Sequence, residues 1–336
     1  AGIPVFGPSK AAAQLEGSKV FAKDLMKKYN IPTAAYGVFH KIDEAKAFIA
    51  QTGAPIVVKA DGLAAGKGVV VAMTIDEANV AVEDMLSGNR FGDAGSTVVI
   101  EEFMEGEEAS LLAFVDGKTV VPMIASQDHK RIFDGDKGPN TGGMGTYAPA
   151  PVLTDALRDA AMKTILEPMV AAMEKEGMPY VGCLYAGLMI TDEGPKVVEF
   201  NARFGDPETQ VVLPLLDSDL GEIMMACAKG TLTSNMVKWK DSSAACVILA
   251  SKGYPETSSK GDVISGDIKQ YDTTIVFHSG TKLVGENYVT NGGRVLGVVG
   301  LGKDLRTALD RAYERIEHID FEGMQYRTDI GAKAFK

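Results

Sequence analysis

The chain has 336 residues, 46% of them hydrophobic, and a formal net charge of −11; one hydrophobic core rarely organises that length, so we expect two or three domains. The acidic balance argues against nucleic acid as a partner, because a phosphate backbone is bound through basic surface. No apolar run is long enough to span a bilayer, so we expect no membrane partner, and the residues at the start of the sequence do not have the pattern expected of a signal peptide.

The first third of the chain alternates helices with strands. Ser18 follows Gly17 and is expected to cap a helix, because its hydroxyl can accept from a backbone N–H of the first turn. Periodicity then predicts a compact α/β unit. Its helices are expected at 19–29, 43–51 and 75–86, and its strands at 55–59 and 68–72.

The middle of the chain predicts a second set of strands and one long helix. A buried strand is expected at 98–103, a hairpin over 111–124, paired strands at 185–191 and 195–200, and a helix between Asp219 and Gly230. The helix over 155–175 contains Pro168, which is expected to kink it. Between these elements, residues 127–149 are predicted to form a long, polar, glycine-rich loop.

The pattern of predicted elements changes near Lys238. Short strands at 244–250, 274–279 and 295–300 are separated by turns, and an amphipathic helix is expected at 305–319. This pattern predicts a separate C-terminal α+β domain that begins near residue 238.

Cysteines and histidines show no metal-ligand spacing. His40, His278 and His318 lie far apart along the chain. Three widely spaced cysteines in apolar surroundings predict buried free thiols, as in a reducing cytoplasm. These are Cys183, Cys227 and Cys246.

The first candidate site is the glycine-rich segment 62–68 between two predicted strands. It is one residue shorter than a Walker A loop and lacks the strand–helix context, which disfavours a P-loop. Its glycines would let backbone N–H groups approach a phosphate, and Lys59 and Lys67 would supply charge. A solvated hairpin that merely needs glycine explains the segment equally well.

The second candidate is the acidic segment 101–108, which follows a buried strand. Its carboxylates could accept hydroxyl groups of a ribose, and the strand end could pair with an adenine edge. Taken alone, the segment is better explained as a charged surface turn.

The third candidate is the row Glu199, Asn201 and Arg203 at the end of an apolar strand. Residues two apart on a strand face the same side, so Glu199 and Asn201 present two oxygen ligands together. Such ligands suit Mg²⁺, and Arg203 could stabilise a transferring phosphoryl group. A polar strand edge is the alternative.

The fourth candidate is the segment 128–145, which combines cationic donors with small residues. It could cradle a substrate or a phosphate, since loops of this length are usually functional or disordered. The alternative is an ordinary long loop.

In this order the four segments resemble the ATP-grasp superfamily. Together they resemble its phosphoribosylamine–glycine ligase family, also called glycinamide ribonucleotide synthetases. The motif Asp128-His129-Lys130-Arg131 with residues 138–145 is the most specific part, and the resemblance extends over the whole chain to residues 277–281 and 292–296. It implies an α+β fold: an ATP-grasp fold, whose two α/β subdomains sandwich ATP, plus a C-terminal α+β domain.

The resemblance also implies a domain division. Family members begin with a Rossmann-like N-terminal domain that helps to bind phosphoribosylamine; we expect it to be missing here, which leaves turnover by this chain alone open. The expected segments are a remnant with the entry helix at 1–31, a lid subdomain at 32–97, a main subdomain with the metal site at 98–237, and the C-terminal domain at 238–336.

The activity that the resemblance implies is an ATP-dependent carbon–nitrogen ligation in de novo purine biosynthesis. ATP would phosphorylate glycine to glycyl phosphate, and the amine of 5-phosphoribosylamine would then attack, giving glycinamide ribonucleotide, ADP and phosphate. The cofactor would be Mg²⁺ or Mn²⁺. Two alternatives stay open: a non-catalytic ATP-binding fragment, and another ATP-grasp carboxylate–amine ligase.

Roles for individual residues follow from the same resemblance. Arg203 and Lys67 are expected to be catalytic, and Glu199 and Asn201 to hold the metal. The expected ATP-binding residues are Lys19, Lys59, Lys67, Glu101, Glu102, Phe103, Met104, Glu108, Arg131 and Asn140. The expected substrate-binding residues are Asp206, Pro207 and Arg294.

Overall fold

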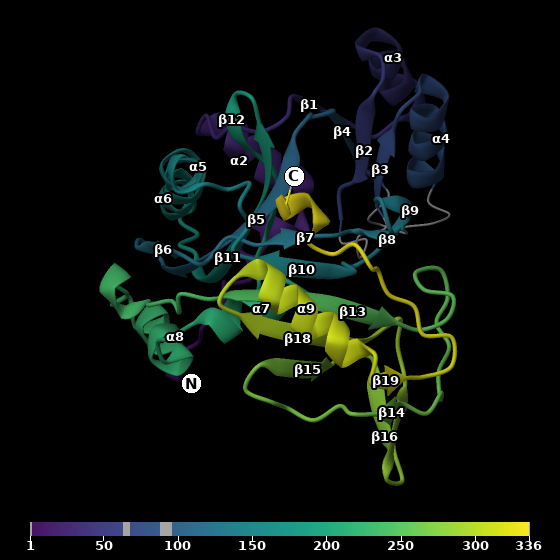
Figure 1. The fold of residues 1–336 in the computed structure, drawn as a ribbon. Coiled ribbons are helices and arrows are strands. Elements are labelled where there is room, and N and C mark those ends of the chain that lie inside the picture. Colours follow the sequence, from purple (N-terminus) through teal and green to yellow (C-terminus); the bar gives the residue numbers. More distant parts are fainter. Residues whose placement is uncertain (1, 63–67, 88–95, 336) are drawn as a thin grey trace. The chain divides into compact units, whose positions relative to one another are not determined.

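The computed structural model describes residues 2–62, 68–87 and 96–335, and the chain forms two compact units. Unit 1 comprises residues 1–122, 153–203 and 221–234, and unit 2 comprises residues 123–152, 204–220 and 235–336. Each unit is thus made of three separate stretches of the chain, whose order can be followed by the colours in Figure 1. The division into four consecutive segments stays a prediction.

The first sheet of unit 1 is four-stranded and antiparallel, in the order β1-β4-β2-β3. Helices α3 and α4 pack on it, and α4 begins at a capping box of Thr74 and Glu77. Buried apolar side chains such as Ile49, Val58 and Met85 form the core between helices and strands. The elements are β1 (Tyr36–Phe39), α3 (Ile42–Thr52), β2 (Ile56–Ala60), β3 (Val69–Ala72), α4 (Ile75–Leu86) and β4 (Val98–Glu102).

The second sheet of unit 1 is also antiparallel, in the order β12-β11-β5-β6. Its strands are β5 (Glu107–Asp116), β6 (Val120–Pro122), β11 (Val181–Thr191) and β12 (Gly194–Asn201). The predicted hairpin over 111–124 and the predicted pairing of 185–191 with 195–200 are therefore confirmed.

The helices of unit 1 follow the predicted positions with one difference. Ser18 accepts a hydrogen bond from the Phe21 backbone N–H and caps α2, as predicted. The predicted helix over 155–175 is helical throughout but contains a π-helical turn at Met162–Leu166, and Pro168 lies just after this turn. These helices are α1 (Gln14–Gly17), α2 (Lys19–Lys28), α5 (Asp155–Ala161), α6 (Glu167–Lys175) and α8 (Leu220–Lys229).

Unit 2 is built on a five-stranded antiparallel sheet in the order β15-β18-β13-β10-β7. Helix α9 packs on β18 and β13, and a Cβ at Gly300 would lie 2.0 Å from the Ala308 carbonyl oxygen, so only glycine permits this approach (Figure 1). The elements are β7 (Gln127–Asp128), β10 (Gly145–Ala148), α7 (Thr209–Val212), β13 (Ser243–Ala250), β15 (Thr274–His278), β18 (Arg294–Gly302) and α9 (Leu305–Ile316).

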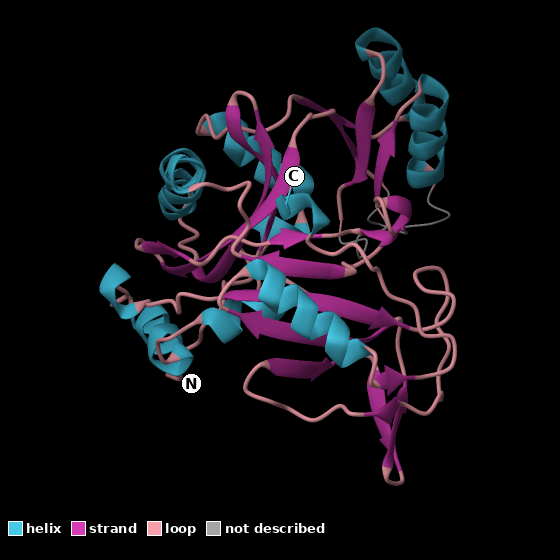
Figure 2. Ribbon diagram, viewed as in Figure 1, coloured by secondary structure: helices cyan, strands magenta, loops and turns pink. Residues whose placement is uncertain are grey.

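The prediction of a loop over 127–149 is wrong, because the segment contains four strands. Strands β7 and β10 complete the sheet of unit 2, and β8 (Arg131–Phe133) pairs with β9 (Lys137–Asn140) in a hairpin. Figure 2 shows these short strands in magenta. Two further strand pairs are β14 (Ser265–Gly266) with β19 (Ile319–Asp320), and β16 (Thr281–Val284) with β17 (Asn287–Thr290).

Three short 3₁₀ turns complete the described elements. They lie at Leu213–Leu215, Ser234–Met236 and Ala332–Phe335. The three cysteines are buried free thiols, as predicted. Among the described residues, no helix is both long and apolar enough to cross a membrane.

Candidate functional site

The centre of the candidate site in unit 1 is Lys59, near the end of β2. Its Nζ donates to Glu101 Oε2 at 2.9 Å and to the Val198 carbonyl oxygen at 3.1 Å. Val198 is the extra residue of a β-bulge, since Gly187 faces Glu199 while Leu188 faces Val197, and its carbonyl is therefore not used in the regular ladder. The bulge brings Lys59 to the strand that carries Glu199 and Asn201.

A second buried lysine accompanies Lys59. Lys23 lies on the inner face of α2, and its Nζ is 3.0 Å from the same Glu101 oxygen. Burial lowers the pKa of Lys23 to about 8, although the neighbouring Glu101 charge favours the protonated form. Lys23 was not among the residues predicted from the sequence; its place in a helix face with Ala22, Leu25 and Met26 was the signal that could have identified it.

Lys19 lies at the start of α2 and faces the same region. Its Nζ is 3.1 Å from the Gly62 carbonyl oxygen and 3.5 Å from that of Asp61. Burial lowers the pKa of Lys19, while the negative charge of Glu199 raises it. The predicted catalytic residue Lys67 falls outside the described residues.

The row at the end of β12 has the geometry that the spacing predicts. Glu199 Oε1 accepts from Asn201 Nδ2 at 3.4 Å, and Arg203 Nη2 lies 3.4 Å from Asn201 Oδ1. Glu16 was not predicted as a site residue, yet its carboxylate accepts hydrogen bonds from Arg203 Nε at 3.0 Å and from the Ala202 backbone N–H at 2.8 Å. Glu16 thus orients the residues that follow the strand.

Glu199 and Asn201 present the donor types that a hard divalent cation requires. Both offer oxygen atoms, and Mg²⁺ is bound by one or two protein oxygens completed by phosphate and water. Among the residues that the structure describes, no group of three or more histidine, cysteine, aspartate or glutamate side chains could hold a metal. The two side-chain oxygens of Glu199 and Asn201 fit a cation whose remaining ligands are phosphate and water.

The segment predicted to frame adenine and ribose leaves the end of β4. Glu101 is buried, whereas Glu102 pairs its backbone N–H with the Ala35 carbonyl oxygen at 2.9 Å. Phe103 and Met104 are half-buried, and Glu108 is exposed near the start of β5. Their roles toward a nucleotide remain predictions.

The predicted substrate residues Asp206 and Arg294 meet in unit 2. Arg294 Nη2 donates to Asp206 Oδ2 at 3.1 Å, and Nη1 donates to the carbonyl oxygens of Asp206 and Gly142 at 2.9 and 2.6 Å. Gly143 has a φ of +112°, and a Cβ there would lie 2.5 Å from Pro207 Cδ. The glycine-rich segment thus packs closely against the turn at Asp206 and Pro207.

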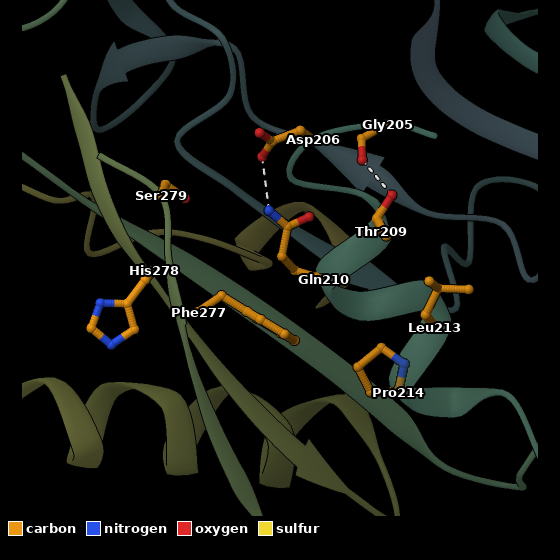
Figure 3. A pocket seen from close by; sticks show the side chains of 9 residues that line it. All are labelled: Gly205, Asp206, Thr209, Gln210, Leu213, Pro214, Phe277, His278 and Ser279. Carbon is orange, nitrogen blue, oxygen red and sulfur yellow. Dashed lines mark hydrogen bonds between the residues drawn. The ribbon is translucent and has the colours of Figure 1, made fainter. Parts of the chain in front are cut away.

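A cleft of about 710 Å³ opens beside this turn. Figure 3 shows Gln210 donating to Asp206, an interaction of 2.8 Å between Nε2 and Oδ1, and Thr209 donating to the Gly205 carbonyl oxygen. The other side of the cleft is formed by Phe277, His278 and Ser279 at the end of β15. Burial lowers the pKa of His278.

Arg131 and Asn140, predicted to reach the nucleotide, face each other across the β8–β9 hairpin. Arg131 Nη1 donates to the Gly138 carbonyl oxygen at 2.6 Å. The structure therefore brings these two residues together within unit 2, and their contact with a nucleotide stays a prediction.

Two descriptions of known protein domains match the chain. The ATP-grasp (A) domain of phosphoribosylglycinamide synthetase matches residues 17–209, and the C domain of the same enzyme matches residues 244–333. The matches leave only short segments uncovered, so the resemblance seen in the motifs extends to both parts of the chain.

Two curated relatives with the same name cover nearly the whole chain. A phosphoribosylamine–glycine ligase of Halalkalibacterium halodurans is 55% identical over 333 residues, covering 99% of this chain and 77% of the relative. The protein of that name from Neisseria meningitidis serogroup A is 55% identical over 336 residues, covering 99% of this chain and 79% of the relative.

Solved structures agree with the fold. The phosphoribosylamine–glycine ligase of Thermotoga maritima superposes with a TM-score of 0.89 at 38% identity, over 97% of this chain and 82% of that one. The biotin carboxylase domain of Hydrogenobacter thermophilus 2-oxoglutarate carboxylase, 17% identical, gives a TM-score of 0.76 over 97% and 70% of the two chains. The predicted ATP-grasp fold is thereby confirmed, and the chain belongs to the phosphoribosylglycinamide synthetase family.

Proposed function

We propose that this chain uses ATP to join glycine to 5-phosphoribosylamine, giving glycinamide ribonucleotide, ADP and phosphate in purine biosynthesis. Family membership and relatives of that name at 55% identity support the proposal. The observation that carries it is the contact between Lys59 and the Val198 carbonyl, because it places a buried ammonium group beside the Glu199–Asn201 row.

The reaction brings negative charges together when the carboxylate of glycine attacks the γ-phosphoryl group of ATP. Catalysis of such a transfer is mostly positioning and charge neutralisation. In this proposal Lys19, Lys59 and Lys67 bind the phosphates, and Arg203 stabilises the transferring group. The buried setting of Lys59 strengthens these interactions, because the local dielectric constant is lower than that of water.

Glu199 and Asn201 would hold a divalent cation, Mg²⁺ or Mn²⁺, through their side-chain oxygens. When bound, the cation neutralises negative charge on phosphate oxygens. Arg203 lies within 3.4 Å of the Asn201 amide and keeps that side chain oriented.

Further roles are proposed for residues of both units. The segment 101–104 would frame adenine, with Glu108 at the ribose and Arg131 and Asn140 also at the nucleotide. Asp206, next to Pro207, would bind the ammonium group of glycine, and Arg294 the phosphate of the sugar. We also place the protein in the cytoplasm, since three buried free thiols suit a reducing compartment.

The test of the activity is ADP release by the chain with Mg²⁺, ATP, glycine and 5-phosphoribosylamine, with the product identified by its mass. We expect ADP only when both co-substrates are present. Turnover with other carboxylic acids but not with glycine would indicate another ATP-grasp ligase. ATP binding without turnover would indicate a non-catalytic ATP-binding protein.

The metal assignment has its own test in Glu199→Ala. Loss of one oxygen ligand should lower kcat/KM for Mg-ATP by about 100-fold, because the cation contributes several kcal/mol of charge stabilisation. Glu193→Ala is the matched control, since Glu193 is an exposed carboxylate in the turn before β12 and pairs only with Lys196 among the described residues. If Glu199→Ala binds and turns over Mg-ATP like the control, Glu199 is not a metal ligand.

A further inference from the structure

Two buried lysines share one carboxylate oxygen in unit 1. Lys23 Nζ and Lys59 Nζ lie 3.0 and 2.9 Å from Glu101 Oε2. The side chains of Lys23, Lys59 and Glu101 are exposed by 2%, 6% and 3%. A single buried ion pair needs only one lysine, so the second ammonium group calls for a different explanation.

The hydrogen bonds distinguish the two lysines. Lys23 Nζ has three acceptors, because Thr33 Oγ1 at 2.9 Å and the Ala34 carbonyl oxygen at 3.4 Å accompany Glu101. An ammonium group has three N–H donors, so Lys23 is saturated by the protein. Lys59 has two acceptors among the described residues, Glu101 and the Val198 carbonyl, and keeps one donor for a ligand.

The count of charges also points to a ligand at Lys59. Two ammonium groups against one carboxylate leave one positive charge within the triad of Lys23, Glu101 and Lys59. A buried charge without a partner is costly, so the surplus is expected to be met by an anion. The pKa of Lys23, lowered by burial to about 8, still leaves it mainly protonated at neutral pH.

We propose that Lys23 is the counter-ion of Glu101 and a positioning residue for Lys59, which thereby keeps an uncompensated positive charge for the phosphate chain of a nucleotide. Glu101 fixes the Lys59 ammonium group through one oxygen, and Lys23 neutralises the charge of that oxygen. Without Lys23, Glu101 would cancel the charge of Lys59 itself. The inference rests on the proposed function, in which Lys59 binds phosphate.

The test is nucleotide affinity, measured by calorimetry with the full chain and the magnesium complex of the non-hydrolysable analogue AMP-PNP. Lys23→Met removes the counter-ion, and we expect its dissociation constant to rise about tenfold, as for one unit charge lost near the phosphates at an intermediate dielectric constant. Lys28→Met is the control, because Lys28 lies on the same helix in an exposed pair with Glu176. The control should bind like the unmodified chain.

The double variant Lys23→Met/Glu101→Gln decides between charge balance and direct contact. It restores one net positive charge, and the Gln amide oxygen can still accept from Lys59. We therefore expect it to bind the analogue more tightly than Lys23→Met alone. An affinity no tighter than that of Lys23→Met overturns the proposal, and so does an unchanged affinity of a folded Lys23→Met variant.

Folding of the variants is followed by thermal unfolding. If Lys23→Met fails to fold because it removes one member of the buried Lys23–Glu101 pair, the double variant still decides, since replacing both members of a buried ion pair is usually tolerated. An unmodified chain that does not bind the analogue would contradict the proposed function itself, which separates that failure from failure of the inference.

Discussion

Each unit contains a cluster of buried cationic and acidic side chains, but the two clusters differ in the ratio of positive to negative charge. In unit 1, Lys23 and Lys59 share the single carboxylate of Glu101. In unit 2, Arg327 is 1% exposed and donates to two carboxylates, those of Asp136 at 2.9 Å and Asp329 at 2.7 and 2.8 Å. The same degree of burial thus accompanies two different arrangements.

The cluster of unit 2 has no surplus positive charge. Lys333 pairs with Asp136 at 2.6 Å, so the two cations face the carboxylates of Asp136 and Asp329, and Asp134 lies beside Asp329 as a further carboxylate. Arg327 Nη1 also donates to the Arg131 carbonyl oxygen at 3.1 Å, and these contacts join the segment 327–333 to the β8–β9 hairpin. A cluster without surplus positive charge needs no anionic ligand and holds chain segments together, whereas the surplus charge of unit 1 is suited to an anion.

The largest effect expected from this comparison is loss of stability in Arg327→Met. The variant leaves the partly buried Asp329 without its arginine and Asp136 with Lys333 alone, which should lower the free energy of unfolding by about 3 kcal/mol. The change is measured as a shift of the urea midpoint. Arg158→Met, which breaks exposed pairs with Asp155 and Asp159, should change stability by less than about 1 kcal/mol.

Nucleotide affinity provides the contrast for the same variant. The Arg327 cluster has no surplus positive charge, but it holds the β8–β9 hairpin that carries Arg131 and Asn140. Folded Arg327→Met should therefore lose less affinity for Mg-AMP-PNP than Lys23→Met does. A stable Arg327→Met variant that loses more affinity than Lys23→Met would reverse the distinction drawn between the two clusters.

The second expected effect is a loss of stability at acid pH through the buried His129. His129 is buried; its Nδ1 lies 3.2 Å from the Gly145 carbonyl oxygen, and its Nε2 accepts from the Gly331 N–H at 3.4 Å. Burial, helped by the positive charges of Arg327 and Lys333, lowers the pKa of His129 to about 4. The unfolded chain therefore binds more protons than the folded chain between pH 6.5 and pH 4.

The contribution of neutral His129 to the free energy of unfolding is fully present above pH 6.5 and is lost as the pH falls toward 4. It amounts to about 3 kcal/mol. His129→Gln removes the titrating group, so the fall in urea midpoint between these pH values should be smaller than in the unmodified chain. His318→Gln, at an exposed position, should leave the fall unchanged. An equal fall in His129→Gln would show that other groups control the acid response.

Local signals in the sequence predicted most of unit 1. Ser18 caps its helix as predicted, and the helix predicted at 75–86 begins after Thr74, since capping depends on residues within one turn. The sheet of unit 2 was only partly predicted, because β10 pairs Thr146 with Cys246, a partner distant in the chain. Local periodicity cannot specify such a pairing, and the glycines around β10 were interpreted as a loop.

The candidate site shows the same limit. The period of a strand predicted that Glu199 and Asn201 lie side by side, and they do. No spacing rule could predict that Lys23 meets Glu101, because helix and strand come together only through packing. Likewise Asp206 and Arg294 were assigned to different substrate groups, and only the fold shows that they form an ion pair.

That ion pair carries the smallest expected change in stability. It differs from both buried clusters in being accessible, with Asp206 and Arg294 exposed by 51% and 20%. Breaking it by Arg294→Met should cost less than about 1 kcal/mol of stability, since solvent screens such pairs. If the pair serves a substrate, the KM for glycine or 5-phosphoribosylamine should instead rise by about tenfold, the loss of one charged contact.

The matched control is Arg306→Met, an exposed arginine of the same unit whose guanidinium carbon lies 3.9 Å from the centre of the Phe335 ring. It should leave both KM values unchanged. A loss of more than about 2 kcal/mol in Arg294→Met with unchanged KM values would assign the Asp206–Arg294 pair to the fold, because a group that contacts substrate must affect binding when it is removed. The accessible Asp206–Arg294 pair would then indicate a ligand no better than the buried cluster around Arg327 does. Only the triad of unit 1, with its surplus positive charge, would mark a binding site.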